Sequence, residues 1–236
     1  MNLPKVQFMD LGLMEYQKCW DFQTKLFEET VQQKIHNRKN PRQLKITKNH
    51  LIFCEHPHVY TLGKSGDEKN LLINREEQET KKVTFFKTNR GGDITYHGPG
   101  QLVVYPILDL DHFFSDIHKY LRYLEESVIL TLKDYGLNAK RIEGLTGVWV
   151  EGQNNIDKKI CAIGVKSSRW VTMHGIGFNI NSDLSYFSNI IPCGIDDKAV
   201  TSLSNELGKS IDMTELKNRF KNNFIHTFRI ELLESK

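Results

Sequence analysis

The sequence has few cysteines, and they do not form a framework. Its 236 residues include only four, at positions 19, 54, 161 and 193, with no CxxC motif among them. A small secreted domain held together by disulfides would need a denser set of cysteines. The cysteine pattern therefore favours free thiols in a reducing compartment.

Strong charge and long apolar runs are also missing. The formal net charge is +3 and the pI is about 8.5, which is too mild to indicate a nucleic-acid-binding protein but is compatible with an acidic protein partner. No apolar run approaches the length of a membrane span. The first residues, MNLPKVQFMDLG, lack the basic start and apolar stretch of a secretion signal. We therefore expect a cytoplasmic protein that does not enter the membrane.

The pattern of strands and helices indicates the fold class. Hydrophobic residues make up 39% and charged residues 26% of the chain, as in ordinary globular domains. Strand-like segments come in clusters, with helical patterns at both ends and in the middle, so the strict βαβ alternation of a Rossmann fold is absent. We predict an α/β fold in which residues 1–236 form a single domain.

Several local patterns give element boundaries. The spacing of apolar residues predicts a first helix from Leu13 to about His36, and the polar segment 33–49, interrupted by Pro41, is predicted to be a basic loop. A second helix is expected after Asp116, and a last helix after the N-cap Asp212. In the strand-like segment 101–110, Pro106 suggests a sheet edge or a bulge.

A glycine-rich segment is the first candidate for chemistry. Residues 90–101, RGGDITYHGPGQ, contain four glycines, which allow a backbone to approach a ligand closely. No Gly-Lys-Ser/Thr follows, so this is not a Walker A motif. The segment could be an elaborate turn between two strands, but Arg90, Tyr96 and His97 favour a binding site.

Two strand-like segments around Lys166 share a face that has little side-chain bulk. Side chains alternate in a strand, so Ala162, Gly164 and Lys166 point to one side. A hairpin closed at residues 168–169 would place Ala162 opposite Gly175 and Ile160 opposite Gly177. This pattern predicts a narrow slot for an unbranched chain that ends at Lys166, although small residues could equally allow a helix to pack closely. His174 alternates with Ile176 and Phe178 and is expected to point into a packed layer.

Cys193 is the cysteine whose context suggests reactivity. It lies in the segment IIPCGI, where proline and glycine indicate a loop, whereas Cys19 falls in a predicted helix, and Cys54 and Cys161 in predicted strands. A loop thiol can be exposed to substrate. The histidines at positions 56, 58, 97 and 174 show no helical or finger spacing of metal ligands, so no metal site is expected.

At these segments the sequence resembles the lipoyl(octanoyl) transferases, which belong to the biotin/lipoyl protein ligase fold. The matching stretches are HPHVYTLGKSG, RGGDITYHGPGQLVVYPILDL, GVWV, KICAIGVKSSRWVTMHGIGFNIN, IIPCGI and VTSLSNELG. The resemblance implies a mixed, largely antiparallel sheet flanked by helices. It also implies that Cys193 is the acyl-thioester nucleophile and Lys166 its partner. The implied substrate-binding residues are Arg90, Gly91, Gly92, Asp93, Ile94, Thr95, Tyr96, His97, Ala162, Ile163, Gly164, Gly175, Ile176 and Gly177.

The implied reaction moves an octanoyl group from acyl carrier protein to a lysine of a lipoyl domain. The acceptors would be oxo-acid dehydrogenase E2 subunits or the glycine-cleavage H protein, and no cofactor, nucleic acid or membrane is implied. An ATP-dependent lipoate or biotin ligase of the same fold is the main alternative, although such an enzyme has no need of a nucleophilic cysteine. A non-enzymatic module that binds partners through the basic loop is a second alternative.

Overall fold

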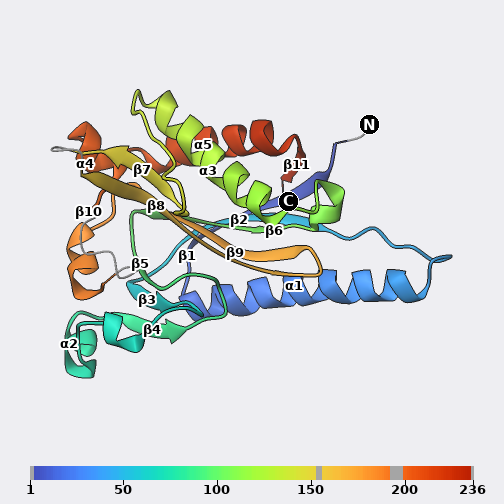
Figure 1. The fold of residues 1–236 in the computed structure, drawn as a ribbon, viewed down its shortest axis with the longest axis horizontal. Coiled ribbons are helices and arrows are strands. Elements are labelled where there is room, and N and C mark those ends of the chain that lie inside the picture. The colour runs from blue at the N-terminus through green and yellow to red at the C-terminus, as the bar shows by residue number, and fades with distance from the viewer. Residues whose placement is uncertain (1–2, 153–155, 192–198, 235–236) are drawn as a thin grey trace.

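The structure combines a large mixed sheet, which has helices on both faces, with a smaller sheet beside it (Figure 1). It is a computed structural model that describes residues 3–152, 156–191 and 199–234. Within these ranges the strands of the large sheet are β1 (Lys5–Leu13), β2 (Asn49–Glu55), β6 (Gln101–Ile107), β7 (Val148–Glu151), β8 (Asp157–Ser168), β9 (Val171–Asn179), β10 (Ala199–Val200) and β11 (Glu231–Glu234). The predicted α/β class is confirmed.

The strand order of the large sheet is β10-β8-β9-β6-β2-β1-β11, and β7 pairs with β8. β1 lies parallel to β2 and β11, and β10 lies parallel to β8. The pairs β2–β6, β6–β9, β8–β9 and β7–β8 are antiparallel. The sheet is therefore mixed and largely antiparallel, as the resemblance implies.

Three short strands form a separate small sheet, and one of them lies inside the glycine-rich segment, where the sequence analysis expected no strand. β3 (Val59–Leu62) lies between β4 (Thr84–Lys87) and β5 (Ile94–His97), and the short helix α2 (Arg75–Thr80) connects β3 to β4. Periodicity identifies strands but not which sheet they join, so the sequence did not predict this division.

Helices cover the two faces of the large sheet. α1 (Tyr16–Lys39) packs on β9 and β6, whereas α3 (Ile117–Asp134) and α5 (Met213–Phe228) pack together on the opposite face (Figure 1). The short helix α4 (Leu203–Leu207) precedes α5. The apolar residues of α5 recur every fourth position and are buried: Leu216, Phe220, Phe224 and Phe228. The Asp212 side chain accepts hydrogen bonds from the amides of Thr214 and Glu215, which confirms the predicted cap. In the described part of the chain, no helix combines the length and apolarity that crossing a bilayer requires.

The predicted end of the first helix was wrong. α1 continues to Lys39, so the basic loop comprises residues 40–48 rather than 33–49. Residues 33–39 are polar but contain no helix breaker. The helix ends at Asn40 because Pro41 disfavours helical backbone at the residue before it.

Pro106 does not mark a sheet edge, because β6 lies between β2 and β9. The alternative expectation, a bulge, is not met either, because the pairing of β6 with β2 and with β9 shows no register shift around Pro106. Regular pairing of β6 with β9 covers Gln101–Val104 only. Beyond it, the Pro106 carbonyl accepts a hydrogen bond from the Thr172 hydroxyl at 2.8 Å, and His174 has a positive φ of 59°. The proline, which has no N–H, thus lies in a short interruption of the ladder, and the pairing resumes in the same register at Asp109 and Val171.

The β8–β9 hairpin is shifted by two residues from the predicted register. Its turn consists of Arg169 and Trp170, both with positive φ, a two-residue connection whose twist suits a hairpin. Ala162 therefore lies opposite Gly177, and Gly164 lies opposite Gly175. A shift of two preserves the alternation, so the small residues still share one face, as predicted.

Candidate active site

A cavity of about 200 Å³ lies between the glycine-rich segment and the small-residue face of β8 and β9. Most of its wall is apolar. The residues predicted to bind substrate that line it are Arg90, Gly92, Asp93, Ile94, Thr95, His97, Ala162, Ile163, Gly164, Gly175, Ile176 and Gly177. The structure thus brings together two segments more than sixty residues apart in the sequence.

Glycine is required on this face for two different reasons. A Cβ at Gly175 would lie 2.0 Å from the Val104 carbonyl oxygen, and one at Gly164 would lie 2.9 Å from the Gly91 carbonyl oxygen. These two glycines allow backbones to pass close to one another. A Cβ at Gly177 would meet mainly the Gln101 and His97 side chains, at 3.0 and 3.3 Å. Gly177, together with Ala162, keeps space open in the cavity.

Arg90 supplies a buried positive charge beside the cavity. Its guanidinium donates hydrogen bonds to the carbonyl and hydroxyl oxygens of Thr61 and to the Gly91 carbonyl oxygen. Only 7% of the residue is exposed. The charge of Arg90 adds to burial in lowering the pKa of His174 to about 3.

His97 is neutral and has a defined tautomer. Gln101 donates from Nε2 to the Tyr96 carbonyl and to Asn179 Oδ1, so its Oε1 is left to accept a hydrogen bond from His97 Nδ1 at 2.6 Å. Burial lowers the His97 pKa to about 3, and His56 adds to the shift. The unprotonated Nε2 is therefore the acceptor that this ring offers at neutral pH.

Two predicted binding residues do not line the cavity. The Tyr96 side chain points into a cluster with Tyr60, Tyr186 and Phe187, and its hydroxyl lies 2.7 Å from His58 Nδ1. Gly91 donates its amide to the Val165 carbonyl at 2.9 Å and so closes the glycine-rich segment onto β8. Both residues therefore hold the glycine-rich segment in position without lining the cavity themselves.

His174 does not share a face with Ile176 and Phe178 as expected. Its ring centroid lies 6.2 Å from that of Trp20 on α1, and its Nε2 lies 2.7 Å from Asn89 Oδ1. Ile176 and Phe178 belong to the core beneath α3 and α5. The left-handed backbone at His174 breaks the alternation of β9 at this residue.

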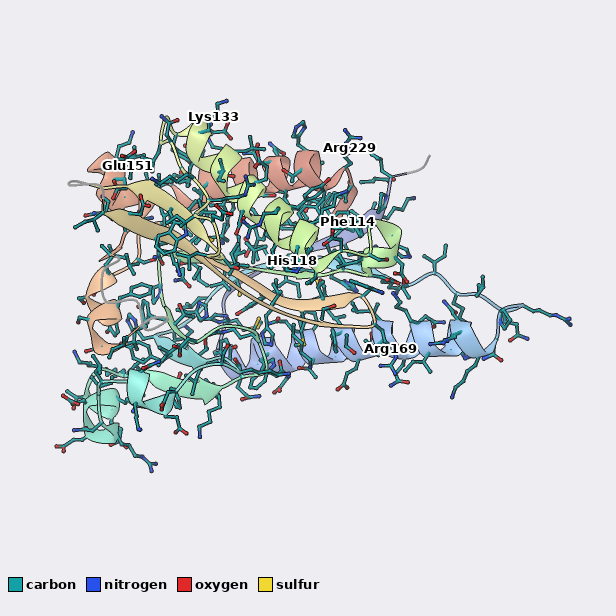
Figure 2. All side chains as sticks on the ribbon, viewed as in Figure 1. Phe114, His118, Lys133, Glu151, Arg169 and Arg229 are labelled. Atoms are coloured by element: carbon teal, nitrogen blue, oxygen red, sulfur yellow. The ribbon has the colours of Figure 1, made fainter. Side chains whose placement is uncertain are left out.

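Lys166 does not line the cavity. Its Nζ lies 4.8 Å from the centroid of the Phe27 ring on α1, and burial followed by the neighbouring charge of Lys64 lowers its pKa. Lys166 is near the hairpin tip marked by Arg169, whereas Glu151 marks the far end of the β7–β8 pair (Figure 2).

Lys159, near that far end, does line the cavity, and the sequence analysis overlooked it. Its Nζ lies 4.6 Å from the centroid of the Trp149 ring. The register of β7 and β8 shifts between Val148–Cys161 and Trp149–Lys159, so Ile160 is an extra residue on β8. Ile160 and Cys161 both pack into the core on the α3 face, and the side chains of Lys159 and Ala162 both line the cavity. A β-bulge thus redirects Lys159, which strict alternation had placed on the other face.

Cys193 lies outside the described residues, but both flanks of its segment are positioned. On the N-terminal side, the Ile191 amide donates to the Asn70 carbonyl, and Tyr60 donates to the Tyr186 carbonyl and accepts from Asn189. On the C-terminal side, Val200 pairs with Lys159 and lines the cavity. The described chain thus stops at Ile191, which is held by Asn70, and resumes at β10, which pairs with Lys158 and Lys159.

The other three cysteines are buried thiols. Burial raises the pKa of Cys54 and of Cys161 well above the usual value. Such groups are protonated at neutral pH and shielded from a large substrate. Their predicted positions in a helix and in strand interiors are confirmed for Cys19, Cys54 and Cys161.

Several cavity residues carried no sequence signal. Tyr16 begins α1, Tyr105 lies in β6, and residues 144–146 precede β7. They converge only through the pairing of distant strands. Before the fold was known, nothing in their local pattern distinguished them from core or loop residues.

The comparisons with known proteins agree with this arrangement. The model of the lipoyl protein ligase A/B catalytic domain matches residues 15–225. An octanoyltransferase of Christiangramia forsetii is 57% identical, with 97% of both chains covered, and one of Flavobacterium johnsoniae is 56% identical, with 97% of this chain and 99% of that protein covered. A bipartite lipoate protein ligase of Thermoplasma acidophilum superposes with a TM-score of 0.71 at 15% identity, covering 100% of this chain and 87% of that one, which shows the shared fold. The chain therefore belongs to the lipoyl protein ligase A/B catalytic-domain family and, within it, to the octanoyltransferases.

Proposed function

We propose that this acyltransferase carries an octanoyl group on Cys193 and delivers it to a lysine amine of a lipoyl domain. The observation that carries this proposal is that an apolar floor, a lysine and the strand that follows the Cys193 segment all meet at one cavity. Its apolar floor includes Ala162 and Gly177, and Lys159 and Val200 lie side by side on its wall. Val200 follows Cys193 by seven positions in the sequence.

The first half-reaction acylates the enzyme. The Cys193 thiol gives up its proton, and its thiolate attacks the thioester carbonyl of octanoyl-acyl carrier protein. The carbon–sulfur bond to phosphopantetheine breaks, and the leaving sulfur takes up one proton, equal to the one that Cys193 lost. A free cysteine is only a few per cent thiolate at neutral pH. An ammonium about 4 Å from the sulfur stabilises the thiolate by up to about 4 kcal/mol at an intermediate dielectric. This lowers the pKa of the thiol by about three units before the cost of desolvation is subtracted. A lysine beside Cys193 therefore serves this step.

The second half-reaction regenerates the enzyme. The acceptor lysine attacks the Cys193 thioester as a neutral amine, the amide forms, and the thiolate leaves. A basic side chain must take the proton that the amine loses. The acceptors that we propose are lipoyl domains of oxo-acid dehydrogenase E2 subunits and the glycine-cleavage H protein. The thioester already supplies the activation, so no soluble cofactor enters either step.

Of the two candidate lysines, geometry favours Lys159 as the partner of Cys193. Lys159 lines the cavity beside the returning strand β10, whereas Lys166 is seven residues further along β8, about 23 Å away at the rise of a strand. Lys166 remains the alternative partner, and substitution of each lysine distinguishes them. Both assignments place the reaction in a reducing compartment, the cytoplasm, where the catalytic thiol persists.

The test is an intact-mass measurement after the protein is mixed with octanoyl-acyl carrier protein alone. We expect a covalent octanoyl adduct that Cys193→Ala abolishes and that Cys161→Ala retains, since Cys161 is a thiol buried in the core on the α3 face. Adduct formation on any other cysteine would overturn the proposal. Incorporation of free octanoate that requires ATP would instead support the ligase alternative.

A further inference from the structure

We propose that Cys19, Cys54 and His56 form a buried zinc site that joins α1 to the large sheet. The three side chains come from α1, from β2 and from the residue just after β2, and their ligand atoms all lie within 4.8 Å of one another. All three residues have 0% relative exposure. The reaction proposed above uses none of them.

The distances fit tetrahedral coordination. Zinc bonds to sulfur at about 2.3 Å and to histidine nitrogen at about 2.0–2.1 Å, so in a tetrahedron two sulfurs lie about 3.8 Å apart, and a sulfur and a nitrogen about 3.6 Å apart. The Cys19 and Cys54 sulfurs are 3.9 Å apart, and Cys54 Sγ is 3.6 Å from His56 Nε2. Two of the three distances between ligand atoms therefore match a zinc site, and the third, between Cys19 and His56, is at most 4.8 Å.

His56 is oriented as zinc-binding histidines are. The Met14 carbonyl oxygen, 2.7 Å from Nδ1, accepts the Nδ1 proton and leaves the Nε2 lone pair directed at the cluster. The Tyr105 hydroxyl, 2.8 Å from Nε2, donates a hydrogen bond to this lone pair, and a bound zinc ion would take its place.

Charge balance allows an ion in this interior. Binding expels the two thiol protons, and two thiolates with one Zn²⁺ make a neutral group, which avoids the cost of an isolated buried charge. Cysteine sulfur and imidazole nitrogen are the donors that zinc takes at structural sites. The ion would also fix part of the cavity wall, because Tyr105 lines the cavity and the Tyr16 ring, also in its wall, is 5.2 Å from that of His56.

The experiment is reconstitution of the reduced full-length protein with Zn²⁺ and, in parallel, with Co²⁺. We expect one equivalent of zinc per chain, a Tm raised by about 5 °C at saturating zinc, and the intense thiolate-to-cobalt charge-transfer absorption of a tetrahedral site. Cys54→Val and Cys19→Ala should each lose the absorption and most of the bound zinc. Two substitutions on different elements guard against the misfolding of one, and circular dichroism checks both.

Cys161→Val is the matched control, because Cys161 is equally buried but lies outside the cluster. Cys193→Ser controls for zinc held by the proposed nucleophile. Both variants should still bind one equivalent of zinc per chain. Substoichiometric zinc in the wild-type protein, or a cobalt spectrum unchanged by Cys54→Val, would overturn the site. A Cys19–Cys54 disulfide in place of metal, seen as a mass lower by two hydrogens, would overturn it as well.

Discussion

Lys159 and Val200 are register partners in the parallel pair of β8 and β10. This pair is only two residues long, yet it fixes where the segment containing Cys193 returns to the sheet. The Thr201 amide extends the contact by donating to the Lys159 carbonyl at 2.9 Å. The strand pairing thus holds the described chain that follows Cys193 next to a cavity lysine.

We expect Lys159→Ala to slow acylation of Cys193 by about 10² to 10³-fold, since it removes the charge that would ionise the thiol. Lys166→Ala should change the rate by less than about threefold, because Lys166 contacts Phe27 outside the cavity. The measurement is a quenched time course by intact mass. The opposite ranking of the two variants would assign the role to Lys166.

Lys159→Arg separates the two tasks assigned to the lysine. Arginine keeps the positive charge but does not deprotonate in proteins. The variant should still acylate Cys193 but transfer slowly to the lipoyl domain, so that acyl-enzyme accumulates. Rapid discharge onto the acceptor would show that the role of Lys159 is electrostatic only.

The small-residue floor predicts chain-length selectivity. Ala162→Leu adds bulk to a cavity of about 200 Å³ and should lower octanoyl use at least tenfold while sparing acetyl or butyryl donors. Gly177→Ala should have the same effect in milder form, since the added methyl meets side chains that can move. Gly175→Ala is expected to destabilise the fold instead, because its Cβ would lie 2.0 Å from a backbone oxygen. Equal loss of short and long donors in folded Ala162→Leu would argue against this slot.

The buried histidines make the protein sensitive to acid. His97 and His174 have folded-state pKa values of about 3, against 6.5 for the ordinary imidazole. The unfolded chain therefore binds protons that the folded chain does not, and the stability present above pH 6.5 is lost as the pH falls below it. Each residue should lower the unfolding free energy by up to about 1.4 kcal/mol per pH unit until its folded pKa is reached.

Urea denaturation at several pH values measures this slope. His174→Gln should reduce the slope by the contribution of one proton. His118→Gln, at an exposed position on α3, is the control and should leave the slope unchanged (Figure 2). An unchanged slope in His174→Gln would mean that His174 is protonated in the folded protein.

The basic loop should have little part in donor recognition. It begins after Lys39 at the far end of α1, about 35 Å along the helix from the cavity residue Tyr16. Reversal to glutamate of Lys39, at the end of α1, and of the loop residues Arg42 and Lys45 should therefore alter octanoyl transfer by less than about twofold at low ionic strength. A larger, salt-sensitive loss would indicate that a partner docks over the length of α1.

The sequence predicted the elements well where local chemistry decides them. Asp212 caps α5 as expected, and the alternation of Ala162 and Gly164 placed both on the cavity face in spite of the shifted register. It failed where geometry depends on strands distant in sequence. The bulge at Ile160 turned Lys159 toward the cavity, and Cys19 meets Cys54 only because α1 packs on the sheet. Neither event has a signature in a short window of sequence.

The parallel pairing of β1 with β11 has a consequence for synthesis. Lys5 lies beside Glu231, so strands 226 positions apart in the sequence are neighbours. While the chain emerges from the ribosome, the edge of β1 that pairs with β11 stays uncovered until residue 231 has been synthesised. An uncovered strand edge is a template for pairing with other chains. The edge of β1 therefore stays open to pairing with other chains until β11 has been synthesised.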